Sequence, residues 1–158
     1  MTDCAAKVVE LLIERGLKIS AAESCTGGLF TKMITDVAGS SAVLDASVVT
    51  YANEAKIKFL GVSESNIIEY GVVSEAVAKE MAKGTTELMG ADIGVGITGI
   101  AGPGGGSKEK PVGLVWTAVC YKGEIYPCKL QLAGSREDIR MNTCKAVFKN
   151  IIELIEKH

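Results

Sequence analysis

The sequence is poor in the residues that most often bind metal ions. Its 158 residues include a single histidine, the terminal His158, and five cysteines that form no CxxC pair. We therefore expect neither a zinc site built from spaced histidine and cysteine ligands nor metal catalysis through imidazole. The odd number of cysteines indicates reduced thiols in a cytoplasmic protein and not a disulfide framework. No metal and no cofactor are predicted.

The chain also lacks an excess of one charge and any long apolar run. Lys and Arg number 17 against 19 Asp and Glu, which gives a formal net charge of −2. Without a basic field, a general nucleic-acid-binding protein is disfavoured. No apolar run reaches membrane-spanning length, and charged side chains interrupt residues 1–15, so neither a membrane anchor nor a signal peptide is expected. We predict partners other than nucleic acid or membranes.

What the chain does have is the size and composition of one globular domain. Hydrophobic side chains make up 47% of the residues and charged ones 23%. A folded chain of this length buries roughly 70% of the surface that its unfolded form exposes, so it needs no disulfide or structural metal. We expect a single domain over residues 1–158. Small chains with several apolar helices often pair through one of them, so a homo-oligomer is possible.

Helical and strand patterns alternate along the chain. Helices are expected over residues 3–15, from 29 to the break at 39–41, over 54–60, from 63 to 70, from 74 to 90, and from 135 almost to 158. Strands are expected over residues 18–22, 43–51, 92–98, 112–121 and 124–132. Because only the last two strands form a clear hairpin, we predict a three-layer α/β/α sandwich with a mixed, mostly parallel sheet and one antiparallel strand.

Several residues at helix starts have the side chains that cap helices. Asn53 is expected to cap the helix over residues 54–60. Ser135, with Asp138 three residues later, resembles a capping box for the final helix. These signals fix where the chain leaves the sheet and begins each helix.

A strand-to-helix turn at residues 23–28 holds the first candidate for chemistry. Ser24 would lie at the carboxyl edge of the sheet and face helix N–H groups that could stabilise an oxyanion. From residue preferences alone, a capping role for Ser24 or Thr26 is the simpler alternative. Cys25 competes as the nucleophile because a helix N-terminus lowers a thiol pKa, but it has no histidine partner, and a small buried thiol is the commoner use.

A serine nucleophile requires a base, and the terminal histidine is unsuited to that role. Residues 50–56 place Tyr51 at a strand end and Lys56 in the first turn of the next helix, also at the sheet edge. To act as a base, Lys56 needs its pKa lowered from about 10.4 to about 7–8, a shift that burial and a helix N-terminus favour. A solvated surface lysine is the common alternative for a helical position.

Glycines dominate residues 99–110. Residues 94–99 match GxGxxG, but this match occupies a predicted strand and opens no helix, so we reject a dinucleotide-binding dehydrogenase. Residues 99–110 also lack the GK[ST] ending of a P-loop. They form either a loop whose backbone N–H groups approach an anion or a flexible connector.

Arg136 and Arg140 are four residues apart near the start of the last helix. Their guanidinium groups could converge on one phosphate, helped by the helix N-terminus. Solvated arginines would show the same spacing.

Taken together and in order, these motifs resemble one family. The runs that carry the resemblance are AESCTGGL (22–29), GSS (39–41), VTYANEAK (49–56), GVVSE (71–75), TGIAGPGGG (98–106) and KPVG (110–113). They are similar to the C-terminal domain of the competence-damage-inducible (CinA) family, and the likeness spans nearly the whole chain. Stand-alone members of that family are nicotinamide-nucleotide amidohydrolases, which convert nicotinamide mononucleotide to nicotinate mononucleotide and ammonia in NAD salvage.

The resemblance implies specific roles for residues of this chain. Ser24 would be the nucleophile, Lys56 its base, and Tyr51 an assistant in proton transfer. The substrate-binding residues that it implies are Thr26, Gly27, Gly28, Thr98, Gly99, Gly102, Gly104, Gly105, Arg136 and Arg140.

The implied mechanism proceeds through an acyl-enzyme and uses no metal. Helix N–H groups near Thr26 and Gly27 would hold the oxyanion, and water would then release the nicotinate nucleotide. The alternative is a non-catalytic nucleotide-binding or regulatory module that has the same fold but no turnover.

Overall fold

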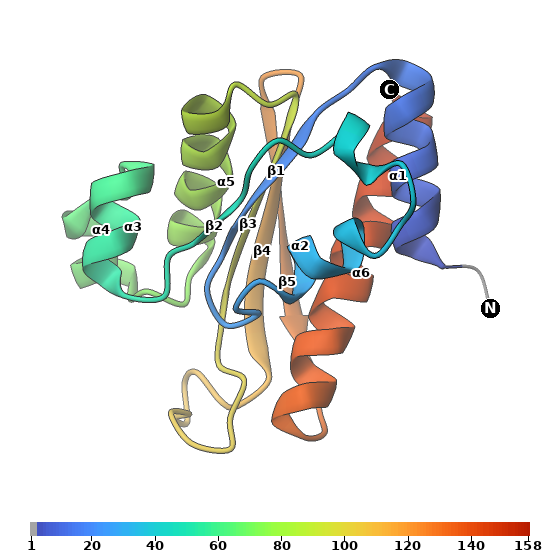
Figure 1. Cartoon of the computed structure of the whole chain (residues 1–158). Helices are drawn as coiled ribbons and strands as arrows, with labels where there is room; N and C mark the ends of the chain where they lie inside the picture. Colours follow the sequence, from blue (N-terminus) through green and yellow to red (C-terminus); the bar gives the residue numbers. More distant parts are fainter. Residues whose placement is uncertain (1–2) are drawn as a thin grey trace.

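A five-stranded sheet organises residues 3–158, the part of the chain that the computed structural model describes (Figure 1). The strands are β1 (Ile19–Glu23), β2 (Val48–Val49), β3 (Ile93–Gly99), β4 (Leu114–Tyr121) and β5 (Glu124–Gln131). They lie in the order β2-β1-β3-β4-β5. β1 is parallel to β2 and β3, whereas β4 is antiparallel to β3 and β5. Since β4 alone is reversed, the predicted mixed sheet is confirmed.

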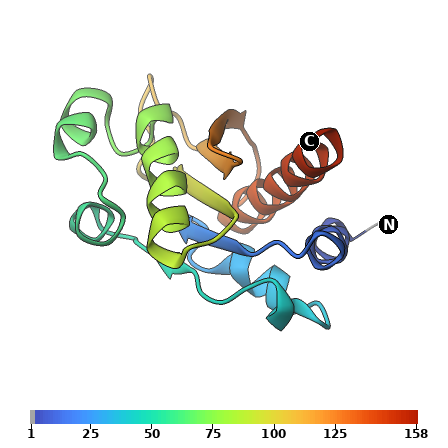
Figure 2. The same ribbon diagram turned by 90° about the horizontal axis from the view of Figure 1, so that it is seen from above.

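Helices cover both faces of this sheet, which confirms the predicted α/β/α layers (Figure 2). The helices are α1 (Cys4–Arg15), α2 (Leu29–Thr35), α3 (Asn53–Leu60), α4 (Glu64–Tyr70), α5 (Glu75–Met89) and α6 (Arg136–Lys157), with a short 3₁₀ turn, η1 (Ser40–Ala42). One face carries α1, α2 and α6; α5 lies on the other, with α3 and α4 beyond it. No helix within residues 3–158 is both long and apolar enough to cross a membrane.

The predicted helix boundaries have the expected local causes. Gly16 and Gly61 end α1 and α3 in the left-handed conformation, with φ of 64° and 68°. The Ser74 side chain caps α5. At the start of α6, Ser135 and Asp138 form a complete capping box.

Two local predictions are wrong. The strand expected over residues 43–51 is limited to Val48–Val49, with an isolated bridge at Leu44, because this edge segment pairs on one side only, with β1. Asn53 is not a cap but the first residue of α3, whose N-cap is Ala52 without a side-chain hydrogen bond. The Asn53 side chain is therefore left free of the helix backbone.

The sheet packs closely against helices on both faces. On one face, the Phe30 and Phe148 rings of α2 and α6 stack with centroids 4.4 Å apart. On the other, α5 approaches β3 because Gly94 and Gly96 have no side chains; a Cβ on Gly96 would lie 2.7 Å from the Ala82 backbone nitrogen. The GxGxxG match therefore lies in a strand, as predicted, and serves helix–sheet packing.

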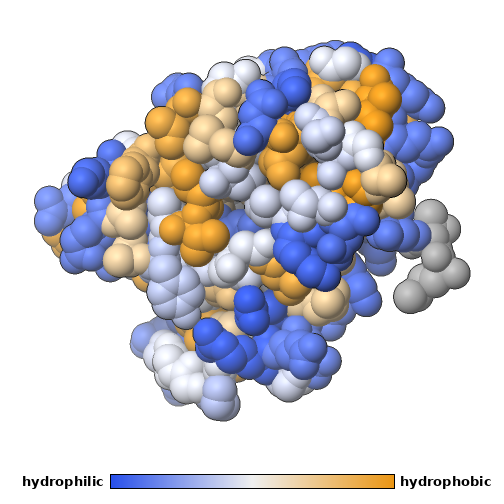
Figure 3. Space-filling model, in the orientation of Figure 1, coloured by the Kyte–Doolittle hydropathy of each residue, from blue (hydrophilic) through white to orange (hydrophobic). Residues whose placement is uncertain are grey.

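The direction of the strands brings four segments together at one edge of the sheet. β1, β2, β3 and β5 point the same way, so the segments that follow them share that edge. These segments are the turn after β1, the start of α3, the glycine-rich loop of residues 100–113 and the start of α6. Parallel α/β sheets bind ligands at this edge. The face of the molecule seen in the orientation of Figure 1 carries separate hydrophobic patches among hydrophilic side chains (Figure 3).

Candidate active site

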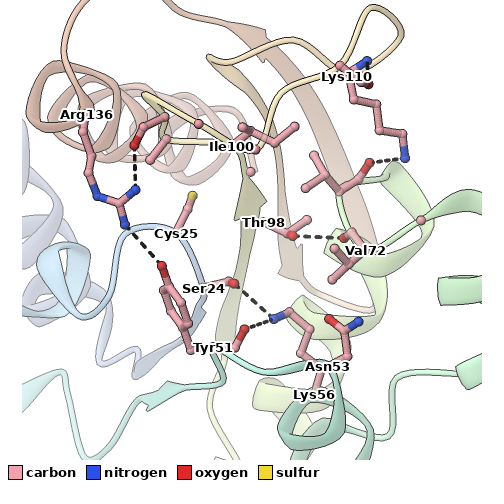
Figure 4. Close-up of a pocket in the computed structure, with 18 residues that line it drawn as sticks. Ser24, Cys25, Tyr51, Asn53, Lys56, Val72, Thr98, Ile100, Lys110 and Arg136 are labelled. Atoms are coloured by element: carbon pink, nitrogen blue, oxygen red, sulfur yellow. Dashed lines mark hydrogen bonds between the residues drawn. The ribbon is translucent and has the colours of Figure 1, made fainter.

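A cavity of about 470 Å³ opens where these four segments meet (Figure 4). The predicted site residues that line it are Ser24, Tyr51, Lys56, Thr98, Gly99, Gly102, Gly104, Gly105 and Arg136. Four predicted residues, Thr26, Gly27, Gly28 and Arg140, do not line it. No group of three or more His, Cys, Asp or Glu within residues 3–158 is placed to hold a metal ion.

The amine of Lys56 is completely buried among three oxygen atoms. Its Nζ lies 2.6 Å from the Thr50 carbonyl oxygen, 3.2 Å from the Tyr51 carbonyl oxygen and 3.0 Å from Ser24 Oγ. Burial lowers the pKa of Lys56 from 10.5 to about 8. With that pKa, roughly a tenth of the amine is neutral at pH 7, and the neutral fraction grows steeply above it.

This arrangement suits a base beside a nucleophile. The two carbonyl oxygens can only accept hydrogen bonds, so a neutral Lys56 amine points its N–H groups at them. Its lone pair is then directed at the Ser24 hydroxyl. β1 positions Ser24 and the first turn of α3 positions Lys56, so rigid elements hold both groups.

Cys25 lines the same cavity but is a weaker candidate nucleophile. Its side chain is buried, and burial raises the pKa of the thiol to about 11. A thiol with this pKa carries almost no thiolate at neutral pH. The raised pKa of Cys25 and the 3.0 Å contact between Ser24 Oγ and Lys56 Nζ therefore favour Ser24.

A buried carboxylate, which the sequence analysis missed, holds the turn that carries Ser24. Glu23 is fully buried and accepts hydrogen bonds from the N–H groups of Phe30 and Thr31 at 2.9 and 3.0 Å. It also accepts from the hydroxyls of Thr26 and Thr31, both at 2.7 Å. Because Glu23 binds the N–H groups of Phe30 and Thr31 in the first turn of α2, these two groups are not available to a substrate oxyanion.

Gly27 and Gly28 shape this turn from outside the cavity. The Gly27 N–H donates to the Ser24 carbonyl at 3.0 Å, so it is not free to bind an oxyanion. Both glycines have positive φ, 57° and 100°, which side chains rarely adopt. Thr26 is also fully buried, with its hydroxyl on Glu23. Thr26 therefore contacts protein, whereas Gly27 is exposed outside the cavity.

Arg136 lies at the rim of the cavity and joins two of its walls. Its guanidinium donates to the Gly102 carbonyl at 2.7 Å and to the Tyr51 hydroxyl at 3.2 Å. The Tyr51 phenol thus makes its hydrogen bond at the rim (Figure 4). Within the described residues, the phenol makes no hydrogen bond to Ser24 or Lys56, so its predicted assistance in proton transfer stays a prediction.

Arg140, one turn later on α6, faces the nucleophile turn instead of the cavity. It donates to two successive carbonyl groups, those of Cys25 at 3.1 Å and Thr26 at 2.9 Å. The structure therefore separates the two arginines that were predicted to converge on one phosphate. Spacing along a helix places both on one face but does not show which neighbour each contacts.

Three further polar residues that line the cavity, Asn53, Ser107 and Lys110, were missed. Asn53 begins α3, and its side chain makes no hydrogen bond within residues 3–158. Lys110, at the far end of the glycine-rich loop, donates to the Val73 carbonyl at 2.8 Å and to the Tyr70 carbonyl. A cation beside a glycine-rich loop was the available signal for Lys110.

Comparison with known proteins gives a consistent result. A sequence model described as the CinA C-terminal domain matches residues 1–155. The nicotinamide-nucleotide amidohydrolase PncC of Enterobacter agglomerans is 53% identical over 135 residues, which cover 85% of this chain and 81% of that protein. The CinA-like protein of Dictyoglomus turgidum is 49% identical over 136 residues, 86% of this chain but 33% of that protein. The chain spans about a third of the length of several curated relatives.

Solved structures share the fold over almost the entire chain. The competence/damage inducible protein CihA from Agrobacterium tumefaciens has a TM-score of 0.94 at 40% identity, covering 98% of this chain and 96% of that one. The CinA superfamily protein KP700603 from Klebsiella pneumoniae has a TM-score of 0.96 at 32% identity, covering 100% of both chains. These similarities confirm the fold.

Proposed function

Since the chain belongs to the CinA C-terminal domain family, we propose that it is an amidohydrolase that converts nicotinamide mononucleotide to nicotinate mononucleotide and ammonia. The observation that carries the proposal is the Ser24 Oγ at 3.0 Å from the buried amine of Lys56. The 53% identity to the Enterobacter agglomerans amidohydrolase supports the substrate class.

In the proposed reaction, Lys56 accepts a proton and donates it again in each of two steps. Its neutral amine takes the Ser24 proton while Oγ attacks the carboxamide carbon and the carbonyl electron pair moves to oxygen. The ammonium then protonates the amide nitrogen, the C–N bond breaks, and ammonia leaves an ester on Ser24. Water attacks this ester with Lys56 again as base, which releases the acid and restores the serine.

The proposed oxyanion donor is a backbone N–H of the turn. The Thr26 N–H makes no hydrogen bond to another residue in the described part of the chain. The Cys25 carbonyl, in the same peptide group, accepts from Arg140, and in a trans peptide the N–H points the opposite way. Arg140 thus fixes the direction of the Thr26 N–H. Such fixed donors contribute strongly to stabilising the transition state of acyl transfer.

Substrate recognition is proposed for the rim of the cavity. Arg136 supplies a guanidinium there, and the loop that includes Gly102, Gly104 and Gly105 can bring backbone N–H groups close to a phosphate. The carboxamide would then lie deeper, beside Ser24. The cavity is lined by no Asp or Glu, so it suits an anionic nucleotide.

The proposal is tested by measuring ammonia release from nicotinamide mononucleotide with four proteins in parallel. We expect turnover by the wild type, a loss of about a thousandfold or more in Ser24→Ala and Lys56→Met, and retention of most activity in Cys25→Ala. Folding of each variant is checked by circular dichroism. Nucleotide binding by the wild type without ammonia release would instead identify a non-catalytic binding module.

A further inference from the structure

Lys110 connects two walls of the cavity that are far apart in the sequence. It lies near the end of the glycine-rich loop, and its ammonium donates to the Val73 carbonyl (Figure 4). The same ammonium also donates to the Tyr70 carbonyl. Residues 71–73 link α4 to α5 and line the cavity opposite Arg136. One side chain therefore ties the loop to the facing wall.

The loop has few other attachments. Over residues 102–110, its hydrogen bonds to the rest of the described chain run only through Gly102, which accepts from Arg136, and through Lys110. Residues 103–109 between these two points are exposed. Backbone hydrogen bonds of Ile100 and Gly113 anchor the two ends of the loop to the sheet, and one cation at each end of residues 102–110 holds the segment between them.

The neighbouring wall is shaped to admit the Lys110 ammonium. Gly71 has a φ of +81°, and a Cβ there would lie 2.6 Å from Lys110 Nζ. Any side chain at position 71 would displace the amine from the two carbonyls. The Thr98 hydroxyl fixes the same wall by donating to the Val72 carbonyl at 3.0 Å.

We propose that Lys110 is a positioning residue that holds the glycine-rich loop and the wall of residues 71–73 at the separation the nucleotide requires. The proposal rests on the amidohydrolase function proposed above. Ser24 and Lys56 are held by β1 and α3, which Lys110 does not contact. Loss of the tether therefore weakens substrate binding more than it slows the chemical step.

The test compares Lys110→Met with Lys108→Met. Lys108 lies on the same loop, is exposed, and makes no hydrogen bond within residues 3–158, so its loss removes the same charge without the contact. We expect Lys110→Met to raise KM for nicotinamide mononucleotide about tenfold or more with kcat within about threefold, because hydrogen bonds from a charged donor are lost. Lys108→Met should change neither constant.

Hydrogen exchange gives a readout that does not depend on activity. In Lys110→Met, the hydrogen-bonded amides of Ser107, Lys110 and Gly71 should exchange faster, while those of α6 and the sheet keep their protection. Unchanged exchange would overturn the tether. Faster exchange with an unchanged KM would overturn its role in substrate binding. If the wild type releases no ammonia, the amidohydrolase proposal fails and with it the role assigned to Lys110, while the exchange result still reports whether the tether exists.

The Gly71→Ala variant separates the hydrogen bonds of Lys110 from its charge. This variant keeps the Lys110 ammonium but moves it, so it should also raise KM and speed loop exchange. Because a side chain at a φ of +81° also strains the backbone, the comparison with the double variant decides the interpretation. In the double variant with Lys110→Met, the two effects should be less than additive, since both act through one contact. Additive effects, or a Gly71→Ala protein with wild-type KM, would show that Lys110 acts through its charge alone and contradict the proposal.

Discussion

The two segments that face each other across the cavity are built in opposite ways. In the nucleophile turn, residues 23–28, a buried carboxylate accepts four hydrogen bonds and Arg140 binds two carbonyls. The glycine-rich loop is exposed over residues 103–109 and is held only near its ends. The reacting groups thus rest on a buried polar network, whereas two cations, the exposed Arg136 and the partly buried Lys110, hold the surface that would contact substrate.

The largest effect is expected from the carboxylate under the nucleophile turn. Glu23→Gln leaves donors without an ionised acceptor in a buried site, so the free energy of unfolding should fall by about 3 kcal/mol. Glu109→Gln is the matched change in the glycine-rich loop, where the side chain is exposed, and should shift stability by less than about 0.5 kcal/mol. Urea denaturation measures both, and equal effects would remove the contrast between the two segments.

Burial of Lys56 predicts a pH-dependent difference in stability. Its folded pKa of about 8 lies below the 10.5 of an exposed lysine, so between these values the unfolded chain binds more protons and stability rises with pH. From pH 7 to pH 10, the wild type should gain about 2 kcal/mol relative to Lys56→Met. Denaturation at several pH values tests this, and a constant difference would show that the amine is not perturbed.

The two arginines of α6 provide a kinetic form of the same comparison. Arg140→Met loosens the nucleophile turn and should lower kcat about tenfold to a hundredfold with little change in KM. Arg136→Met acts at the rim and should mainly raise KM. Steady-state kinetics with nicotinamide mononucleotide separates the two, and a reversed pattern would exchange the proposed roles.

The smallest effects concern single glycines. Gly104 has no heavy atom within 4 Å of an added Cβ and no positive φ, so Gly104→Ala should change stability by less than about 0.5 kcal/mol. Gly27 has a φ of +57° and would place a Cβ 3.4 Å from Arg140 Nη2, so Gly27→Ala should cost about 1 kcal/mol or more. Thermal denaturation of the two variants shows which of the two segments tolerates an added side chain better.

Local patterns in the sequence were sufficient for most of the fold. Alternating helix and strand periods predicted the layers and the reversed β4, and Ser135 with Asp138 predicted the start of α6, because these signals act within a few residues. The short β2 was not predictable, since its length depends on pairing with β1 alone.

The site was predictable where position on the sheet decides it. Ser24 and Lys56 follow strands that share one edge, and the structure brings them together. The contacts of Glu23, Lys110 and Arg140 depend on partners in other elements or turns, 3 to 115 residues away in the chain, so spacing along a single element could not show them.

The central claim is an ester formed on Ser24 beside the Lys56 base. The most direct test is rapid acid quenching during turnover of nicotinamide mononucleotide, followed by peptide mapping by mass spectrometry. We expect the peptide that contains Ser24 to carry the nicotinate mononucleotide acyl group on that serine, in the wild type and in Cys25→Ala, but not in Ser24→Ala. An acyl group on Cys25, or wild-type ammonia release by Ser24→Ala, would contradict the account.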